Sequence, residues 1–173
     1  MLLEVACIIT QGPKLEVVAE SETYVVRHSP EDLKNMSDWS CAQFGWDKHT
    51  LTATPGNLAE KCLSSPTTVE EVDVALAQFV AAHCVKGGAV LAGNSVHCDK
   101  RFLDRYCPTF MSWLHYRIVD VSSFKEVVRR FDPGRFRQLK KPPPPHRALE
   151  DIKGSIAELR WYLENCLKKP LNL

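Results

Sequence analysis

Three short segments contain residue types and spacings that could carry chemistry, and the first is LAGNSVHCD at residues 91–99. A predicted strand ends there in a turn of small residues, and a helix follows. Ligands of α/β proteins bind at such strand ends, and a helix N-terminus favours phosphate. Ser95 and the neighbouring backbone amides therefore form a candidate phosphate site. Asp99 has an alternative reading as a simple N-cap of the helix.

The second segment is HRALED at residues 146–151. His146 follows a proline run and opens a long helix, and Asp151 lies one to two turns further on, beside Ile152 on the core-facing side. A carboxylate near the core requires a partner, for which a metal ion is suitable. A nearby histidine could then take a proton from a metal-bound water. Alternatively, His146 is simply the residue at the start of the helix, and Asp151 is a first-turn acid that interacts favourably with the helix dipole.

The third segment is HYRIVDVSS at residues 115–123, a predicted strand that runs into a helix N-terminus. The Arg117 guanidinium can bind phosphate with two hydrogen bonds, and Ser122 and Ser123 can cap it. Tyr116 can stack on a ring or donate a hydrogen bond. The alternative is a strand with an exposed arginine, followed by a capping serine.

The elements that position these segments follow from hydrophobic periodicity and capping signals. We predict strands over Leu2–Thr10, Leu15–Arg27, Ala89–Gly93 and Tyr116–Val121. Helices are predicted after Ser29, after a capping box Thr67-x-x-Glu70, over Asp99–Tyr106, after Ser123-x-x-Glu126 and over Arg147–Lys168. Residues 41–65 and 140–145 are predicted to be loops. The order indicates an α/β domain with a mixed sheet flanked by helices, opening on a hairpin whose first strand is buried on both faces.

Composition restricts the class of protein. The 173 residues suit one domain, and no apolar run approaches the roughly 18 residues of a membrane span. The net charge of +1 does not indicate a nucleic-acid binder, but six basic residues crowd one stretch: Arg129, Arg130, Arg135, Arg137, Lys140 and Lys141. This stretch could attract phosphates or be a solvated loop.

Seven cysteines without a CxxC pair favour a reducing compartment over a disulfide scaffold. Buried free thiols are one interpretation of these cysteines. A zinc site is another, drawn from Cys84, His97, Cys98, Cys107 and His115.

Taken together, LAGNSVHCDKRFLDRY, HYRIVDVSS and HRALEDI, with MSDWS (36–40) and EVACIIT (4–10), resemble the oligoribonuclease family. That family belongs to the exonucleases named for four acidic residues and a histidine. The resemblance covers essentially the whole chain and implies a single exonuclease domain over residues 1–173, with a ribonuclease H-like mixed sheet. It further implies 3′-to-5′ hydrolysis of very short RNA to mononucleotides by two ions, Mg²⁺ or Mn²⁺. A homodimer in the cytoplasm or the mitochondrion is implied as well.

The resemblance also implies residue roles. Asp99 and Asp151 would bind metal, and His146 would be the general base. Tyr116 and Arg117 would act on the other subunit's site. The 5′-phosphate of a dinucleotide-sized substrate would be capped by Ser95, Arg117, Ser122 and Ser123. Trp39 would stack on a base, unless it is a buried helix tryptophan.

The sequence departs from the family pattern at its start, where the motif Asp-x-Glu-x-Thr-Gly-Leu is absent. We therefore expect two of the four metal ligands to be missing. We also expect a central strand to be missing, so that apolar strand edges face each other across a gap. A smaller departure is Phe44, which stands where a base-contacting histidine is expected; His49 is a candidate replacement.

Three hypotheses remain open at this stage. The chain could be an N-terminally incomplete record of an active exonuclease. It could be a short form with impaired catalysis that binds nucleotides or pairs with a full-length subunit. It could also be an unrelated scaffold or zinc-binding module.

Overall fold

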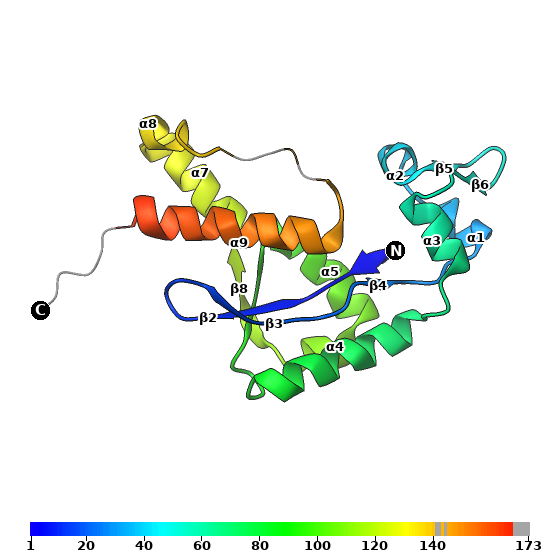
Figure 1. Ribbon diagram of the computed structural model, residues 1–173, viewed down its shortest axis with the longest axis horizontal. Helices are drawn as coiled ribbons and strands as arrows, with labels where there is room; N and C mark the ends of the chain where they lie inside the picture. The colour runs from blue at the N-terminus through cyan, green and yellow to red at the C-terminus, as the bar shows by residue number, and fades with distance from the viewer. Residues whose placement is uncertain (141–142, 144, 168–173) are drawn as a thin grey trace, which may run out of the picture.

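The computed structural model describes residues 1–140, 143 and 145–167, which form helices around small β-sheets (Figure 1). The strands are β1 (Glu4–Val5), β2 (Ile8–Gln11), β3 (Glu16–Glu20), β4 (Tyr24–Val25), β5 (Trp46–Asp47), β6 (Thr52–Ala53), β7 (Val90–Gly93) and β8 (His115–Asp120). The helices are α1 (Pro30–Leu33), α2 (Asp38–Phe44), α3 (Leu58–Ser64), α4 (Val69–His83), α5 (Val96–Tyr106), α6 (Pro108–Met111), α7 (Val121–Phe131), α8 (Pro133–Phe136) and α9 (Ala148–Asn165).

The predicted N-terminal hairpin is confirmed, although each of its two strands is interrupted. β1 pairs antiparallel with β4, with Glu4 opposite Val25, and β2 pairs antiparallel with β3, with Ile8 opposite Glu20. Burial on both faces was a wrong prediction: between residues 1 and 10 only Ala6 is buried. The apolar side chains of this segment are half-buried because they border a cavity.

The second part of the sheet is the parallel pair β7 and β8, with Leu91 opposite Ile118. Parallel neighbours need a crossover connection, and α5 and α6 supply it. The described strands form four separate two-stranded sheets, so β2 and β7 are not hydrogen-bonded to each other. A cavity of about 1630 Å³ is lined by residues 1–11 and by residues 88–94. The expected gap between apolar strand edges is therefore present.

Helices cover these strands from several sides. In Figure 1, α9 and α4 lie on opposite sides of the β2–β3 hairpin. The largest core cluster joins α4 to α5 and α6 through Leu76, Val80, Leu103 and Phe110. A separate cluster packs α7 against α9 through Val121, Val128, Leu159 and Tyr162. α9 is thus anchored by its C-terminal half, while its first turns border the cavity.

Several predicted helix starts are displaced along the chain. The start after Ser29 is confirmed, with a capping box between Ser29 and Asp32. The box predicted at Thr67 lies one residue later, at Thr68 and Glu71. The prediction that Ser123 caps the next helix was wrong. α7 begins at Val121, and its N-cap is Asp120 at the end of β8, whose carboxylate accepts the Ser122 amide. The long helix is confirmed as Ala148–Asn165; its predicted end, Lys168, lies outside the described residues.

The segment 41–65 is more ordered than predicted. α2 ends at Phe44, the β5–β6 hairpin follows with Trp46 opposite Ala53, and α3 begins at Leu58. Gly45 ends α2 with a left-handed backbone, φ 73°, and Asn57 packs closely against it. The strands are only two residues long, which explains why no period-2 pattern was visible.

Candidate active site

Three of the predicted site residues line the cavity between the strand edges. Its wall includes Asp99 from α5, His146 from the segment before α9, and Asp151 from the first turns of α9. Asp99 lies in the first turn of α5, whose N-cap is Ser95, so the reading of Asp99 as the N-cap was wrong. Asp151 is half-buried and lies next to Ile152, as expected from the helix pattern.

The environment of Asp99 disfavours its charged form. Burial raises the pKa of the Asp99 carboxyl, the nearby Asp120 adds to this increase, and His97 opposes it. The side chain nevertheless has solvent access from the cavity. A partly desolvated carboxylate at a cavity wall favours a cation as its neighbour.

His146 has a backbone conformation that few residues adopt. Its φ is 55°, in the left-handed region, where a side chain costs about 1–2 kcal/mol. The Trp39 ring meets the imidazole edge to face, with centroids 5.2 Å apart, and Phe44 meets Trp39 at 6.2 Å. Trp39 is 59% exposed, so its interpretation as a buried helix tryptophan was wrong. The exposed ring of Trp39 therefore provides an aromatic surface beside His146.

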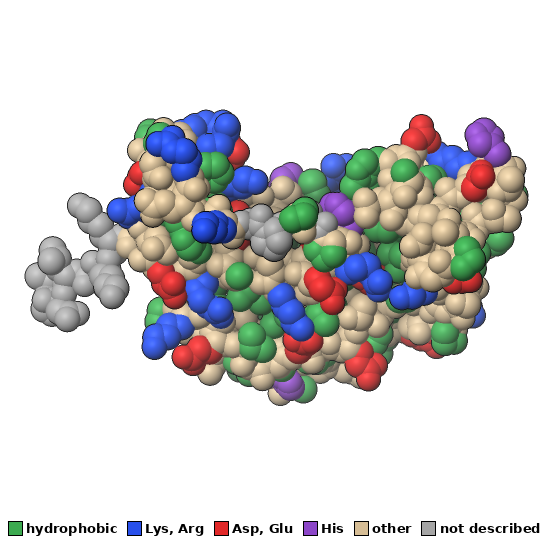
Figure 2. All heavy atoms as spheres, turned by 45° about the horizontal axis from the view of Figure 1, so that its top comes forward, with side chains coloured by type: hydrophobic (Ala, Val, Ile, Leu, Met, Phe, Trp, Pro, Cys, Tyr) green, Lys and Arg blue, Asp and Glu red, His purple; other side chains and the backbone are tan. Residues whose placement is uncertain are grey.

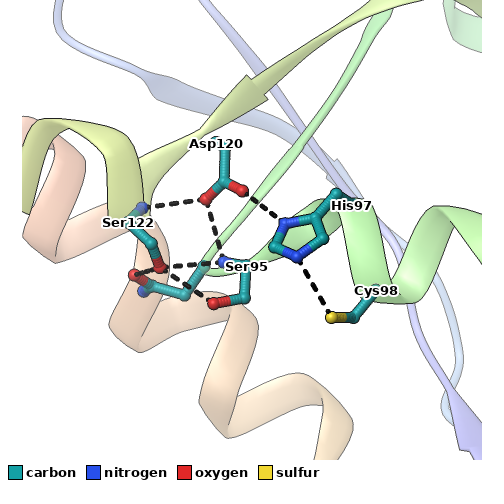
Figure 3. Close-up of polar contacts among 6 residues, drawn as sticks. Ser95, His97, Cys98, Asp120 and Ser122 are labelled. Carbon is teal, nitrogen blue, oxygen red and sulfur yellow. Dashed lines mark hydrogen bonds and ion pairs between the residues drawn. The ribbon is translucent and has the colours of Figure 1, made fainter.

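Ser95 and Ser122 meet at the carboxyl ends of the parallel strands β7 and β8 (Figure 3). Their hydroxyls lie 3.1 Å apart, and the Ser95 amide donates to the Ser122 hydroxyl and to Asp120 Oδ1, each at 2.9 Å. The Ser95 backbone is left-handed, with φ 51°. Two of the four residues expected to bind phosphate thus lie side by side, and their role in phosphate binding stays a prediction. The Ser95 amide, however, already has protein acceptors.

Asp120 is the centre of this cluster, and sequence reasoning missed it. Besides the Ser95 amide it accepts the Ser122 amide at 2.9 Å, and it pairs with His97 Nδ1 at 2.9 Å. Burial alone would raise the pKa of Asp120, but the bonds from His97, Ser122 and Ser95 lower it overall. The other imidazole nitrogen lies 3.3 Å from Cys98 Sγ (Figure 3). An aspartate that ends a strand just before a serine and a helix was the available signal.

Tyr116, Arg117 and Ser123 lie outside the cavity. Tyr116 is 75% exposed on β8, with the Arg117 guanidinium 5.2 Å from its ring centroid and the His115 ring stacked at 4.5 Å. Ser123 is exposed on α7. An exposed tyrosine–arginine pair is compatible with action on a second subunit, which stays a prediction. Phe44 lines the cavity, whereas His49 is exposed in the β5–β6 turn.

The carboxylates present do not fit two divalent ions. Among the described residues no group of three or more His, Cys, Asp and Glu is placed to hold a metal. Glu4 and Glu158 also line the cavity, but Glu4 is paired with Arg147, and Glu158 is hydrogen-bonded to Asn94 and Tyr162. The two expected ligands, Asp99 and Asp151, cannot by themselves neutralise and position two such ions. The same finding contradicts the zinc hypothesis within the described part of the chain. Of the five candidate zinc ligands, Cys107 is buried, and the two ring nitrogens of His97 contact Asp120 and Cys98.

Three of the six basic residues in the basic stretch form ion pairs with nearby acids. Arg129 and Arg130 both pair with Glu126, and Arg135 pairs with Asp132. Lys and Arg side chains are nevertheless prominent over the end of the molecule formed by α7 and α8 (Figure 2). Lys141 lies outside the described residues. The search for a helix able to cross a membrane, made over the described residues, found none.

The amino-acid sequence is similar to those of known exonucleases. Residues 1–159 match the family model described as Exonuclease (RNase_T), which places the chain in the exonuclease class. It is 39% identical over 168 residues to "Oligoribonuclease, mitochondrial" of Bos taurus, covering 97% of this chain and 67% of that protein. The "Probable oligoribonuclease" of Dictyostelium discoideum is 40% identical over 162 residues, 94% of this chain and 79% of its own length. The "Oligoribonuclease" of Neisseria meningitidis serogroup A is 36% identical over 168 residues, with coverages of 96% and 83%. The chain therefore belongs to the oligoribonuclease family.

Proposed function

We propose that this chain is a 3′-to-5′ exoribonuclease that hydrolyses very short RNA to mononucleotides. The observation that carries the proposal is that Asp99, His146 and Asp151 all line one cavity. Asp99 belongs to α5, whereas His146 and Asp151 are near neighbours at the start of α9, so it is the fold that places these two segments along one cavity. Family membership supports the same reaction class.

Each residue has a proposed role in binding or proton transfer. His146 is the general base that accepts a proton from the attacking water. Its position at the cavity wall beside Trp39 supports this role, because a general base must lie within hydrogen-bond reach of the proton that it removes. Trp39 stacks on a base, which its exposure allows. Ser95 and Ser122, with Ser123 and Arg117, bind the terminal phosphate.

Asp99 and Asp151 are the proposed ligands for Mg²⁺ or Mn²⁺. Bound ions would polarise the scissile phosphate and stabilise the leaving oxygen. Because these two carboxylates alone do not fit a pair of ions, two-ion catalysis requires further carboxylate ligands besides Asp99 and Asp151.

A homodimer and an intracellular location complete the proposal. The exposed Tyr116 and Arg117 support a dimer in which one subunit reaches the other's site. Some relatives are named as mitochondrial and others are bacterial, so the mitochondrion and the cytoplasm are both proposed compartments.

The test is mononucleotide release from a 5′-labelled ribodinucleotide by the purified chain in Mn²⁺. We expect Asp99→Ala, Asp151→Ala and His146→Ala each to reduce kcat/KM by about 100-fold or more. The matched control is Asp104→Ala on the same helix as Asp99; Asp104 pairs only with Lys100 on the surface, so activity should be unchanged. Release that survives Asp99→Ala would contradict the assigned site.

A second candidate function is nucleotide binding without hydrolysis, alone or paired with a full-length subunit. The shortage of metal-binding carboxylates favours it. It predicts that the dinucleotide quenches Trp39 fluorescence while no mononucleotide is released. Robust turnover in the previous assay would contradict it.

A further inference from the structure

The first turn of α9 is capped by a residue 144 positions earlier in the chain. Its N-cap residue, Arg147, makes no side-chain cap, and the residues before it offer no Ser, Thr, Asp or Asn. Instead Glu4 Oε1 accepts the Ala148 amide at 2.7 Å. A carboxylate at this place satisfies an orphan donor and complements the helix dipole. Glu4 of β1 thus takes the role that a local side chain usually has.

The same carboxylate also holds the side chain of Arg147. Arg147 Nε donates to both Glu4 oxygens at 3.1 Å, and the Arg147 Nη2 group donates to Oε2. Only 4% of the Glu4 side chain is exposed, so water hardly competes for it. Hydrogen bonding to Glu4 raises the pKa of Arg147. The Glu4 carboxylate, the Arg147 guanidinium and the Ala148 amide thus form one hydrogen-bonded cluster, called the fork below, that links β1 to the start of α9.

This fork is adjacent to the strained residue of the candidate site. His146 directly precedes Arg147 and has the left-handed φ of 55°. Such a conformation persists only where the surroundings fix both sides of it. On one side Trp39 contacts the imidazole; on the other, Glu4 fixes Arg147 and Ala148. Asp151, whose amide donates to the Arg147 carbonyl, belongs to the same first turn.

We propose that Glu4 is a positioning residue, which holds His146 and Asp151 at the cavity wall by capping α9 and clamping Arg147. The catalytic part of this inference depends on the proposed function, in which His146 is the general base. The structural part does not, because it concerns only where the start of α9 lies. The two parts can therefore be tested separately.

The structural part is tested by amide hydrogen exchange and by the imidazole NMR signals of His146. Glu4→Ala removes the cap and the clamp, whereas Glu4→Gln keeps an acceptor for the Ala148 amide but loses the charge. We expect amides of residues 148–151 to exchange about fivefold to tenfold faster in Glu4→Ala, with a smaller change in Glu4→Gln. The His146 signals should shift as the contact with Trp39 is lost. Unchanged exchange and unchanged signals would overturn the proposal.

The matched control is Glu20→Gln. Glu20 of β3 also binds α9, through Lys153 at 3.1 Å, but this pair is exposed and lies beyond the first turn. Glu20→Gln should leave exchange at residues 148–151 and the His146 signals unchanged. If it changes them as much as Glu4→Gln does, the effect is a general loosening of α9 and the proposal is wrong. Should Glu4→Ala fail to fold, Glu4→Gln and Glu4→Asp provide the same comparison.

The catalytic part is tested by steady-state kinetics on the ribodinucleotide. Misplacing the base should lower kcat about 10-fold to 100-fold in Glu4→Gln with KM nearly unchanged, and Glu4→Asp should recover part of the loss. A rise in KM with constant kcat would overturn the assignment. If the unmodified chain shows no turnover, the proposed function fails, while hydrogen exchange and NMR still decide whether Glu4 positions His146.

Discussion

Two aspartates of the site region differ at the level of single side chains. Burial raises the pKa of Asp99, whereas hydrogen bonds from His97, Ser122 and Ser95 outweigh burial and lower that of Asp120. The two pKa values shift in opposite directions because Asp120 accepts hydrogen bonds from two backbone amides. Such bonds favour the charged form of a carboxylate. Asp99 is thus suited to bind a cation, whereas the Asp120 carboxylate is already hydrogen-bonded to the backbone of Ser95 and Ser122.

Asp120 should make stability depend on pH. Its folded pKa is depressed, so its contribution is complete above the unfolded value of roughly 4 and is lost as pH falls through the folded pKa. Asp120→Asn should therefore cost about 1–2 kcal/mol at pH 7 and much less near pH 3. Urea unfolding of both proteins at several pH values measures this. A deficit of equal size at pH 3 and pH 7 would refute it; Asp104→Asn, a surface pair, should differ little at either pH.

At the scale of elements, helix starts depend on acceptors from elsewhere in the chain. Glu4 caps α9, and the buried Asp73 of α4 caps α6 by accepting the Thr109 and Phe110 amides at 3.0 and 2.7 Å. Both carboxylates lie far in sequence from the helix that they cap. In consequence the packing of β1 on α9, and of α4 on α6, is specified by hydrogen bonds as well as by apolar contact.

This dependence sets the limit of prediction from sequence. The order of strands and helices and the gap between strand edges could be predicted from periodicity and the family resemblance. The roles of Asp99, His146 and Asp151, which line that gap, stay a prediction. The helix caps were predicted less well. Ser123 and Thr67 have side chains that can cap a helix, but Asp120 caps α7 and Thr68 caps α4 in their place. Capping across more than thirty residues leaves no local signal, which is why Glu4 was assigned no role beyond strand formation.

Removing the Asp73 carboxylate should therefore weaken two helices at once. Asp73→Ala removes the acceptor of two α6 amides, of which that of Phe110 is buried and that of Thr109 partly buried. We expect a loss of about 2–4 kcal/mol in the free energy of unfolding. Asp73→Asn keeps one acceptor oxygen and should cost less. Urea denaturation gives both values. Glu70→Ala, an exposed acid in the first turn of α4, is the control, and a cost equal to that of Asp73→Ala would rule out the capping argument.

The whole molecule is divided by the cavity. β1–β4 and β7–β8 form separate sheets, and side chains predicted for the core, such as Ile152 and Ile156 of α9, are only half-buried at the cavity wall. Strand edges that lack a neighbour lose backbone hydrogen bonds and apolar contacts together. The two sheets are therefore held mainly by helices, with α4 and α9 as the elements that bridge them.

Such an architecture should unfold in parts. We expect native-state hydrogen exchange to show residues 4–11 and 90–93 opening at free energies well below that of global unfolding, with little dependence on low urea concentrations. Amides in the middle of α4, around the fully buried Leu76 and Val80, should exchange only through global unfolding, since they belong to the largest core cluster. Mass spectrometry of proteolytic fragments resolves these segments. Equal protection of the strands and of α4 would show that the molecule unfolds as one cooperative unit despite the cavity between its sheets.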